Sequence, residues 1–178
     1  RGDVGAREAL LRRHVAEAPV VGAHAILQGG AGSGIDVAAA VHGGLIQYEM
    51  ASRSVVELAW PDGLEMRVLW TGVPASTGDK LRHLAGQAVQ TSSAALTHAA
   101  GDIAEVWRAG DADKVLAGYP DYVAALRRFS VDHDLGIFDA GHDQLTDAAM
   151  AGNLVYKPAG AGGGDVGVLF GRDAADLD

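Results

Sequence analysis

A glycine-rich stretch near the C-terminal end constrains this chain more strongly than any other feature. It reads Lys157-Pro-Ala-Gly-Ala-Gly-Gly-Gly-Asp165, with four glycines and a single alanine among them. Residues 153–156 and 166–170 on either side are rich in branched and aromatic side chains, which predicts two short buried strands. Because glycine tolerates positive φ and carries no Cβ, the loop between them lets backbone N–H groups converge on an external group. Such N–H groups form an anion-binding concavity, commonly for phosphate, although a flexible connection is the alternative interpretation.

Two familiar phosphate motifs do not account for this loop. A Walker A loop ends in Gly-Lys-Ser or Gly-Lys-Thr, whereas here Lys157 precedes the glycines. The spacing Gly162-x-Gly164-x-x-Gly167 matches a dinucleotide fingerprint, but no long helix is predicted to follow it. Neither motif is therefore assigned to this loop.

Composition narrows the classes of partner that the chain can bind. The formal net charge is −9 and no basic stripe is present, which argues against nucleic acid and against an anionic membrane surface. No apolar run approaches the ~20 residues of a membrane span. Cysteine is absent, which removes disulfides and thiolate chemistry and fits a reducing cytoplasm. The histidines are scattered without HExxH, and Gly-x-Ser-x-Gly is missing, so we expect neither a zinc site nor a serine hydrolase.

The hydrophobic pattern divides the chain into strand-rich and helix-rich segments. A helix is predicted over 7–18, and period-2 alternation predicts strands over 46–50, 56–60 and 64–70. From Ser76 the period changes to 3.6, which predicts helices around 81–88, 96–106, 123–129 and 145–150. This order favours mixed α/β or α+β layers, and the Pro61-Asp62-Gly63 turn is the best candidate for a domain boundary.

Asp36 is the first candidate for a chemical role. Ser33 and Asp36 fit a capping box, with serine at the N-cap and an acid at the third helical position of an apolar helix that ends at His42-Gly43-Gly44. An acid at that position also satisfies a helix start and its dipole, which is the structural interpretation. The functional interpretation is that the glycine-rich entry, 29–34, brings a substrate to the helix start, where Asp36 orients or deprotonates a hydroxyl.

The segment Trp70-Thr-Gly-Val-Pro-Ala-Ser76-Thr77 is the second candidate. It predicts a strand end, a turn and a helix capped by Ser76 or Thr77. A strand that leads through a glycine and proline turn to a helix N-terminus is also a ready anion site. The two interpretations are compatible.

Three stretches of the sequence, in this order, resemble segments of the bacterial phosphomevalonate kinases of the GHMP superfamily. They are Gly32-Ser-Gly-Ile-Asp-Val-Ala-Ala-Ala-Val-His-Gly-Gly44, the Trp70 to Thr77 segment, and Lys157 to Asp165. The glycine loop is similar to the superfamily's third motif. Asp165 and the Thr-Gly-x-Pro-Ala-Ser-Thr pattern favour phosphomevalonate kinase over mevalonate kinase. The resemblance extends from Arg7 to Phe170.

The resemblance implies a fold and an activity. Residues 1–61 would be the C-terminal part of the N-terminal, ATP-binding domain with ribosomal-S5-like topology, and residues 62–178 a truncated ferredoxin-like GHMP C-terminal domain. The activity would be transfer of a phosphoryl group from MgATP to 5-phosphomevalonate, giving 5-diphosphomevalonate in the isoprenoid pathway. ATP and Mg²⁺ are thus the expected cofactors, in a cytoplasmic enzyme for which a homodimer is the assembly considered.

The resemblance also implies roles for particular residues. Asp36 matches the aspartate that serves mevalonate kinases as base or substrate-orienting acid. A phosphate acceptor is already ionised near neutral pH, so here Asp36 alternatively positions a lysine or the substrate hydroxyl. The phosphate-binding residues would be Gly160, Ala161, Gly162, Gly163, Gly164 and Asp165. The substrate-binding residues would be Ser33, Gly34, Thr71, Gly72, Ser76, Thr77 and Lys157, and no residue is assigned to a metal.

The sequence departs from the family pattern in several places. Ala159 stands where many relatives have serine, which removes one hydroxyl beside the loop. The superfamily's first motif and its Pro-x-x-x-Gly-Leu-Gly-Ser-Ser phosphate loop are not found in these residues. We therefore expect the chain to be part of a longer kinase and to be inactive by itself. The alternatives are a mevalonate kinase or other GHMP small-molecule kinase, and a GHMP-like domain that binds a metabolite without catalysis.

Overall fold

The computed structural model describes residues 33–88 and 91–177. The chain divides into two compact units, Arg1–Trp60 and Pro61–Asp178, which are described separately below. The predicted helix over 7–18 and most of the glycine-rich entry at 29–34 lie outside the described residues.

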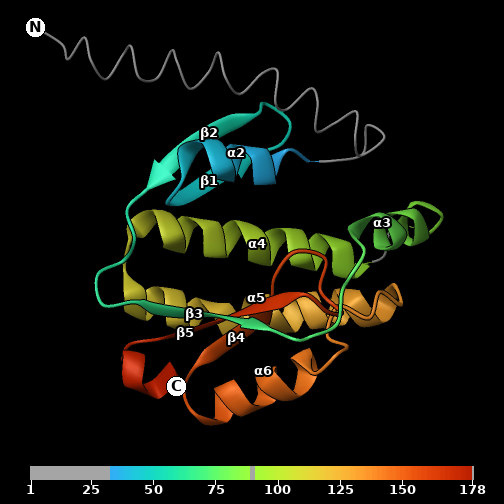
Figure 1. Ribbon diagram of the computed structural model, residues 1–178. Coiled ribbons are helices and arrows are strands. Elements are labelled where there is room, and N and C mark those ends of the chain that lie inside the picture. Colours follow the sequence, from blue (N-terminus) through green and yellow to red (C-terminus); the bar gives the residue numbers. More distant parts are fainter. Residues whose placement is uncertain (1–32, 89–90, 178) are drawn as a thin grey trace, which may run out of the picture. The chain divides into compact units, whose positions relative to one another are not determined.

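The described part of the first unit is one helix followed by a hairpin (Figure 1). Helix α2 (Ile35–His42) ends at Gly43, whose φ of 68° stops it as predicted. Strands β1 (Leu45–Glu49) and β2 (Ser54–Leu58) pair antiparallel, with Leu45 opposite Leu58. Both strands have the predicted length but lie one or two residues earlier than predicted, because the turn begins at Met50 and β2 stops before Trp60.

The predicted capping box at the start of α2 is wrong. Gly34 occupies the N-cap with a left-handed φ of 80°, and no side chain caps the helix. Ser33 lies one residue too early, so its Oγ accepts a hydrogen bond from the N–H of Ile35 at 3.4 Å instead of reaching further into the first turn. A left-handed backbone suits glycine and disfavours serine, which explains the shift.

The second unit is built on a sheet of three antiparallel strands in the order β3-β5-β4. The strands are β3 (Glu65–Trp70), β4 (Val155–Pro158) and β5 (Val166–Gly171). The helices are α3 (Thr77–Ala85), α4 (Thr91–Ala109), α5 (Ala112–Asp132) and α6 (His142–Ala151), with a final 3-10 turn η1 (Ala174–Leu177). Both sheets of the described residues are antiparallel, so the α+β alternative is confirmed and βαβ winding is not seen there.

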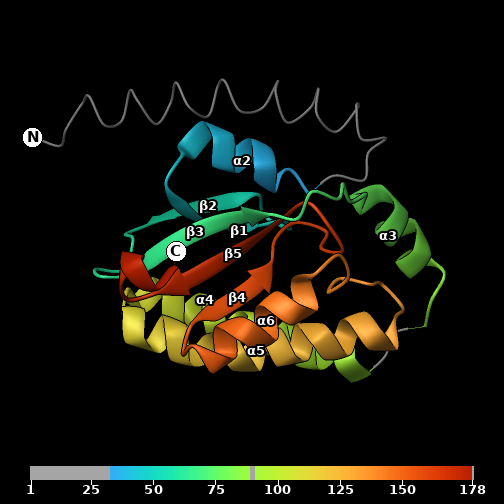
Figure 2. The same ribbon diagram turned by 60° about the horizontal axis from the view of Figure 1, so that its bottom comes forward.

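Helices α4 and α5 run side by side along one face of the sheet (Figure 2). The core between them and the sheet is apolar; its buried members are Leu64, Ile103, Ala112, Val115, Tyr119, Val123, Phe138, Val155 and Phe170. Tyr156 follows Val155 and therefore points to the opposite face, where α6 packs against β4. The strand β4 is thus covered on both sides.

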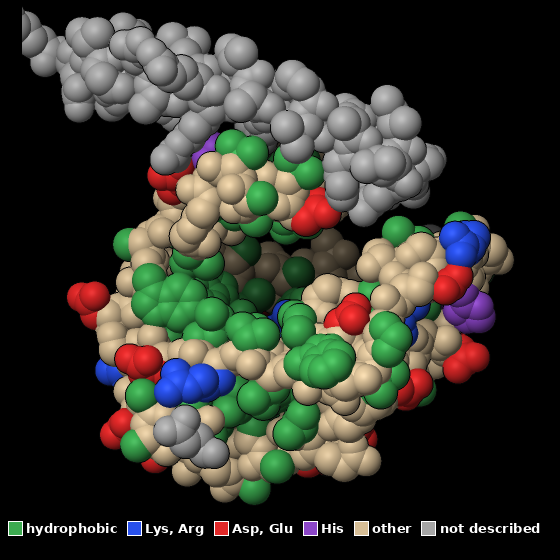
Figure 3. Space-filling view, viewed as in Figure 1, with side chains coloured by type: hydrophobic (Ala, Val, Ile, Leu, Met, Phe, Trp, Pro, Cys, Tyr) green, Lys and Arg blue, Asp and Glu red, His purple; other side chains and the backbone are tan. Residues whose placement is uncertain are grey.

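The apolar face of β3 is less covered. Leu64 is 3% exposed, whereas exposure rises along the strand through Met66, Val68 and Trp70, from 39% to 57% and 73%. Figure 3 shows hydrophobic side chains gathered where Figure 1 draws this strand. The predicted strand is confirmed, but its alternate residues Glu65, Arg67 and Leu69 are partly buried, so the apolar row is not the more buried one.

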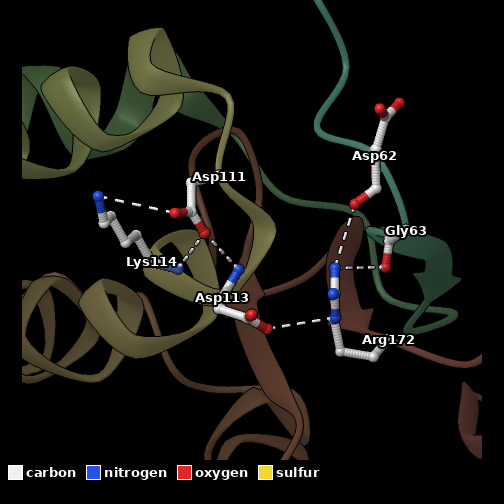
Figure 4. A network of polar contacts seen from close by, with 6 residues as sticks. All are labelled: Asp62, Gly63, Asp111, Asp113, Lys114 and Arg172. Atoms are coloured by element: carbon white, nitrogen blue, oxygen red, sulfur yellow. Dashed lines mark hydrogen bonds and ion pairs between the residues drawn. The ribbon is translucent and has the colours of Figure 1, made fainter.

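Arg172, just after β5, connects the beginning of this unit with α5 (Figure 4). Its Nη1 donates to the carbonyls of Asp62 and Gly63, both at 3.1 Å, and its Nε lies 3.2 Å from Asp113 Oδ1. Asp111 caps α5: its Oδ1 accepts from the N–H groups of Asp113 and Lys114 at 3.0 and 3.2 Å. These contacts join the predicted 61–63 turn to the first turn of α5.

Replacing the Asp111 cap should destabilise the second unit in a pH-dependent way. The N–H of Lys114 holds the pKa of the Asp111 carboxyl below its ordinary value of 3.8. The stabilisation is therefore present above 3.8 and lost as the pH falls through the lowered pKa of the folded state. We expect Asp111→Ala to melt at a lower temperature than wild type at neutral pH, with the gap closing on acidification. Asp111→Asn, which also caps well, should lose much less. Equal melting of the Ala and Asn variants would contradict the cap.

Candidate phosphate-binding site

The glycine loop joins β4 to β5, as predicted. The N–H of Ala159 donates to the carbonyl of Val166 at 2.9 Å and closes the loop at its base. Gly160, Gly162, Gly163 and Gly164 all have positive φ, and so does Asp165. The loop therefore uses the left-handed backbone that the glycines were expected to permit.

Packing also requires glycine at three of these positions. A Cβ on Gly162 would lie 2.5 Å from Ile137 Cγ2, one on Gly163 2.5 Å from the Gly136 carbonyl oxygen, and one on Gly164 2.5 Å from the Val73 carbonyl oxygen. At Gly160 nothing lies within 4 Å. The loop is thus packed closely against the chain from residue 162 onward and open at its beginning.

The N–H groups of the loop divide into two sets. Those of Gly162, Gly163 and Asp165 donate to backbone carbonyls of the protein, at 3.4, 2.7 and 2.6 Å. This differs from the expectation that the whole loop offers its donors outward, because neighbouring carbonyls come close enough to take them. Within the described residues, the N–H groups of Gly160, Ala161 and Gly164 make no backbone hydrogen bond. These are the donors left for a ligand.

The segment after β3 lies beside the loop. The N–H of Thr71 donates to the Asp165 carbonyl at 2.8 Å, and the Thr71 hydroxyl donates to the same oxygen at 3.1 Å. In return, the N–H of Asp165 donates to the carbonyl of Val73. Two motifs that are far apart in the sequence are therefore hydrogen-bonded together, although the Thr71 hydroxyl is engaged with protein rather than pointing freely at a ligand.

Helix α3 begins at the end of this segment. Ser76 is its N-cap, as predicted, and its Oγ accepts from the N–H of Asp79 at 3.3 Å. Thr77 is the first helical residue, and Ser76, Thr77 and the preceding Gly72 are all exposed residues. Gly72 has a φ of 78°, which shapes the turn.

Lys80 is a cation beside the loop that the sequence interpretation missed. Its Nζ donates to the carbonyls of Leu135 and Gly136, the latter at 3.3 Å. A Cβ on Gly163 would lie 2.7 Å from this Nζ, so the amine is next to the loop backbone. The available signal was its position one helical turn after Ser76, which keeps it close to the helix start.

Lys157 lies in β4, opposite Val168 of β5. Its side chain is half-buried, and burial lowers the pKa of its amine below the ordinary 10.5. Among the described residues no hydrogen-bond acceptor or carboxylate partner of this amine is found, and burial is the only cause of the pKa shift. A partly desolvated amine of this kind gains from an anionic ligand.

The remaining predicted residues belong to the first unit. Asp36 is exposed in the first turn of α2, and Gly34 is buried at its N-cap. The Ser33 carbonyl accepts a hydrogen bond from the Tyr48 hydroxyl at 2.9 Å, which fixes the backbone before the helix. In the part of the chain that the structure describes, no cluster of metal-binding side chains is found. None of its helices is both long and apolar enough to cross a membrane.

Comparison with known proteins gives one sequence relative and several similar structures. No family model matches the chain. It is 31% identical over 168 residues to the phosphomevalonate kinase of Streptomyces sp. (strain CL190), covering 78% of this chain and 45% of that protein. The Lin0012 protein from Listeria innocua has a TM-score of 0.75 at 20% identity, covering 86% of this chain and 51% of that one.

A second solved structure is Streptococcus pneumoniae phosphomevalonate kinase in complex with phosphomevalonate and AMPPNP. Its TM-score is 0.66 at 19% identity, and the match covers 82% of this chain and 50% of that one. The chain thus spans about half the length of the relatives it matches. In fold, it is similar to both of these solved structures. More particularly, it is similar to the phosphomevalonate kinases, which confirms the resemblance predicted from its motifs.

Two alanine substitutions in the loop should separate backbone strain from packing. Gly160→Ala and Gly163→Ala impose a similar strain, because φ is 64° at the first position and 72° at the second. That strain costs about 1 kcal/mol of unfolding free energy. Only Gly163→Ala also drives a Cβ into the Gly136 carbonyl, which should cost about 1–3 kcal/mol more. Chemical denaturation measures both, and equal losses would mean that the loop is not packed as described.

Proposed function

We propose that this chain is part of an ATP-dependent small-molecule kinase that phosphorylates 5-phosphomevalonate to 5-diphosphomevalonate. The observation that carries the proposal is the glycine loop, which keeps the N–H groups of Gly160, Ala161 and Gly164 without backbone partners while its other donors hold it in place. The 31% identity to a phosphomevalonate kinase supports the acceptor. So does the similarity to Streptococcus pneumoniae phosphomevalonate kinase in complex with phosphomevalonate and AMPPNP.

The chemistry requires little more than positioning and charge neutralisation. An oxygen of the acceptor phosphate attacks the γ-phosphorus of ATP, the bond from that phosphorus to the β,γ-bridging oxygen breaks, and ADP leaves. Loop N–H groups would bind phosphate oxygens, and Gly72, Ser76 and Thr77 would line the acceptor side at the start of α3. Lys80 and Lys157 would supply positive charge against the net charge of −9.

Mg²⁺ would arrive with the nucleotide. Magnesium in kinases is held by one or two carboxylates together with substrate phosphates, not by an all-protein cage. When bound, the ion would neutralise charge that develops on the transferring phosphoryl group.

Asp36 is proposed to orient the acceptor or a lysine rather than to remove a proton. The attacking phosphate oxygen is ionised near neutral pH, so a general base is dispensable for this acceptor. Asp36 lies in the first turn of α2, which directly follows the N-cap Gly34 and Ser33, whose carbonyl accepts a hydrogen bond from the Tyr48 hydroxyl. The assignment of the units to GHMP domains, a cytoplasmic location and a homodimer remain predictions that accompany this function.

The acceptor is tested by kinetics of the full-length protein with MgATP. We expect turnover with 5-phosphomevalonate and at least about a hundredfold lower kcat/KM with mevalonate, because loss of the acceptor phosphate leaves its binding groups unpaired. Asp36→Asn should lower kcat more than it raises KM for ATP. If the protein turned over mevalonate but not 5-phosphomevalonate, the proposed acceptor would be wrong and mevalonate would replace it. If the protein bound ATP without transferring a phosphoryl group to either compound, a non-catalytic domain would be favoured.

Lys157 provides a test with two opposite readouts. Because its folded pKa is lowered, the unfolded chain binds more protons between that pKa and 10.5, and stability rises with pH across this window. Lys157→Met removes the buried charge, so it should melt higher than wild type at neutral pH, by a margin that shrinks as the pH approaches 10.5.

The same variant should bind substrate more weakly, with KM raised about tenfold for loss of a charged contact. Lys114→Met removes a surface lysine whose side chain is 69% exposed and serves as the matched control. A Lys157→Met protein with unchanged KM would rule out the substrate-binding role. One that is less stable than wild type at every pH would show that the amine has a partner in the fold.

A further inference from the structure

His142 is the most deeply buried polar side chain beside the loop, with an exposed fraction of 0%. It is the first residue of α6. Its Nδ1 lies 2.7 Å from the Tyr156 hydroxyl and its Nε2 lies 2.9 Å from the Gly164 carbonyl oxygen. One imidazole therefore connects α6, β4 and the glycine loop.

The chemistry of the partners assigns the tautomer. A carbonyl oxygen only accepts, so Nε2 must carry the hydrogen that it donates to Gly164. In a neutral ring Nδ1 is then an acceptor, and the Tyr156 hydroxyl donates to it. Tyr156 is 1% exposed, and burial raises the pKa of its hydroxyl, which keeps it a donor. Each polar atom of the pair has one role and one partner.

This arrangement fixes one peptide unit of the loop from both ends. The carbonyl of Gly164 accepts from His142, and the N–H of the same peptide unit, which belongs to Asp165, donates to Val73. Gly164 itself has a φ of 152° and could otherwise adopt many backbone conformations. The N–H of Gly164 is one of the three donors left for a ligand. It lies on the other side of the same Cα, so fixing this peptide unit also restricts the direction of that N–H.

The helix that carries the ring, α6, is itself held in place. The Thr146 hydroxyl donates to the His142 carbonyl at 2.7 Å, and Thr146 is 1% exposed. Arg127 of α5 lies 2.8 Å from Asp143 and 2.9 Å from Asp147, and so attaches α6 to α5. Contacts of this kind, made by residues around a binding site, keep the binding groups within about 0.5 Å of the positions that the ligand requires.

We propose that His142 is a positioning residue, which orients the N–H donors of the loop toward phosphate oxygens by holding the Gly164 carbonyl through Nε2. The inference rests on the proposed phosphate-binding function of the loop. It assigns no contact between His142 and substrate. A positioning role makes one specific prediction: for activity with MgATP, a hydrogen-bond donor at the place of Nε2 matters more than a side chain that fills the space of the ring.

Two amide substitutions separate these possibilities in the full-length protein. The amide nitrogen of glutamine can occupy the place of Nε2, whereas that of asparagine reaches only the place of Nδ1. Both side chains are smaller than the imidazole ring, so both leave a void, the larger one in the asparagine variant, and both should lower the melting temperature. We expect His142→Asn to lower kcat/KM for MgATP about tenfold to a hundredfold, as misplaced binding groups do. His142→Gln should recover activity to within about threefold of wild type, the worth of one ordinary hydrogen bond.

The matched control is His98→Asn, the same change at a histidine whose side chain is 83% exposed, which should have no effect on either quantity. Glycine-selective ¹⁵N labelling of the ligand-free protein adds a readout that does not depend on activity. The amide signals of Gly163 and Gly164 should shift in His142→Asn and much less in His142→Gln. Should the asparagine variant not fold, Tyr156→Phe, which removes only the donor to Nδ1, should shift the same signals.

The outcomes are distinguishable. If the wild-type protein neither binds nor uses MgATP, the proposed function fails, while the amide signals still report whether His142 holds the loop. If wild type is active and the Asn and Gln variants lose activity equally, or neither loses any, the positioning role is overturned. Unchanged loop signals in both His142→Asn and Tyr156→Phe would overturn it as well.

Discussion

The backbone pairing between Asp165 and the segment after β3 is the constraint on which the candidate site depends. It prolongs the β3–β5 ladder beyond Trp70 opposite Val166, with Thr71 donating to Asp165 and Asp165 donating to Val73. A loop this rich in glycine would sample many conformations if it were tied only at its ends. The pairing, together with the Gly163 hydrogen bond to Ile137, restricts it to one path. Only then is the direction of the remaining N–H groups defined.

Rigidity and binding capacity are in competition in such a loop. Each N–H that donates to the protein fixes the backbone but is no longer available to a ligand. Here Gly162, Gly163 and Asp165 serve the first purpose, and Gly160, Ala161 and Gly164 are left for the second. The charged groups follow the same division, since Lys80 is bonded to the carbonyls of Leu135 and Gly136 whereas Lys157 is partly desolvated without a partner among the described residues.

Local pattern predicted the elements well and their partners poorly. The strands around the loop, the Ser76 cap and the apolar periodicity of α4 are short-range signals, and they were confirmed. Helix α5 begins at Ala112, well before the predicted 123–129, because the Asp111 cap and the buried Val115 and Tyr119 continue the helix through Pro120. His142 and Lys80 were missed because their roles arise from contacts with Gly164 and Gly163, which no sequence spacing reveals. Ser33 failed as a cap because a glycine beside it takes the left-handed conformation.

The distribution of the loop's partners along the chain has a thermodynamic consequence. Its carbonyl and donor partners come from Val73, Ile137 and His142, which are brought to the loop only when the strands and α6 have assembled. The entropy of closing those long segments must be overcome before the donors are aligned, so an isolated glycine peptide would have little affinity for an anion. Any ion that does bind there recognises the assembled unit alone. By mass action, it would then protect remote segments such as α4 against unfolding as effectively as the loop itself.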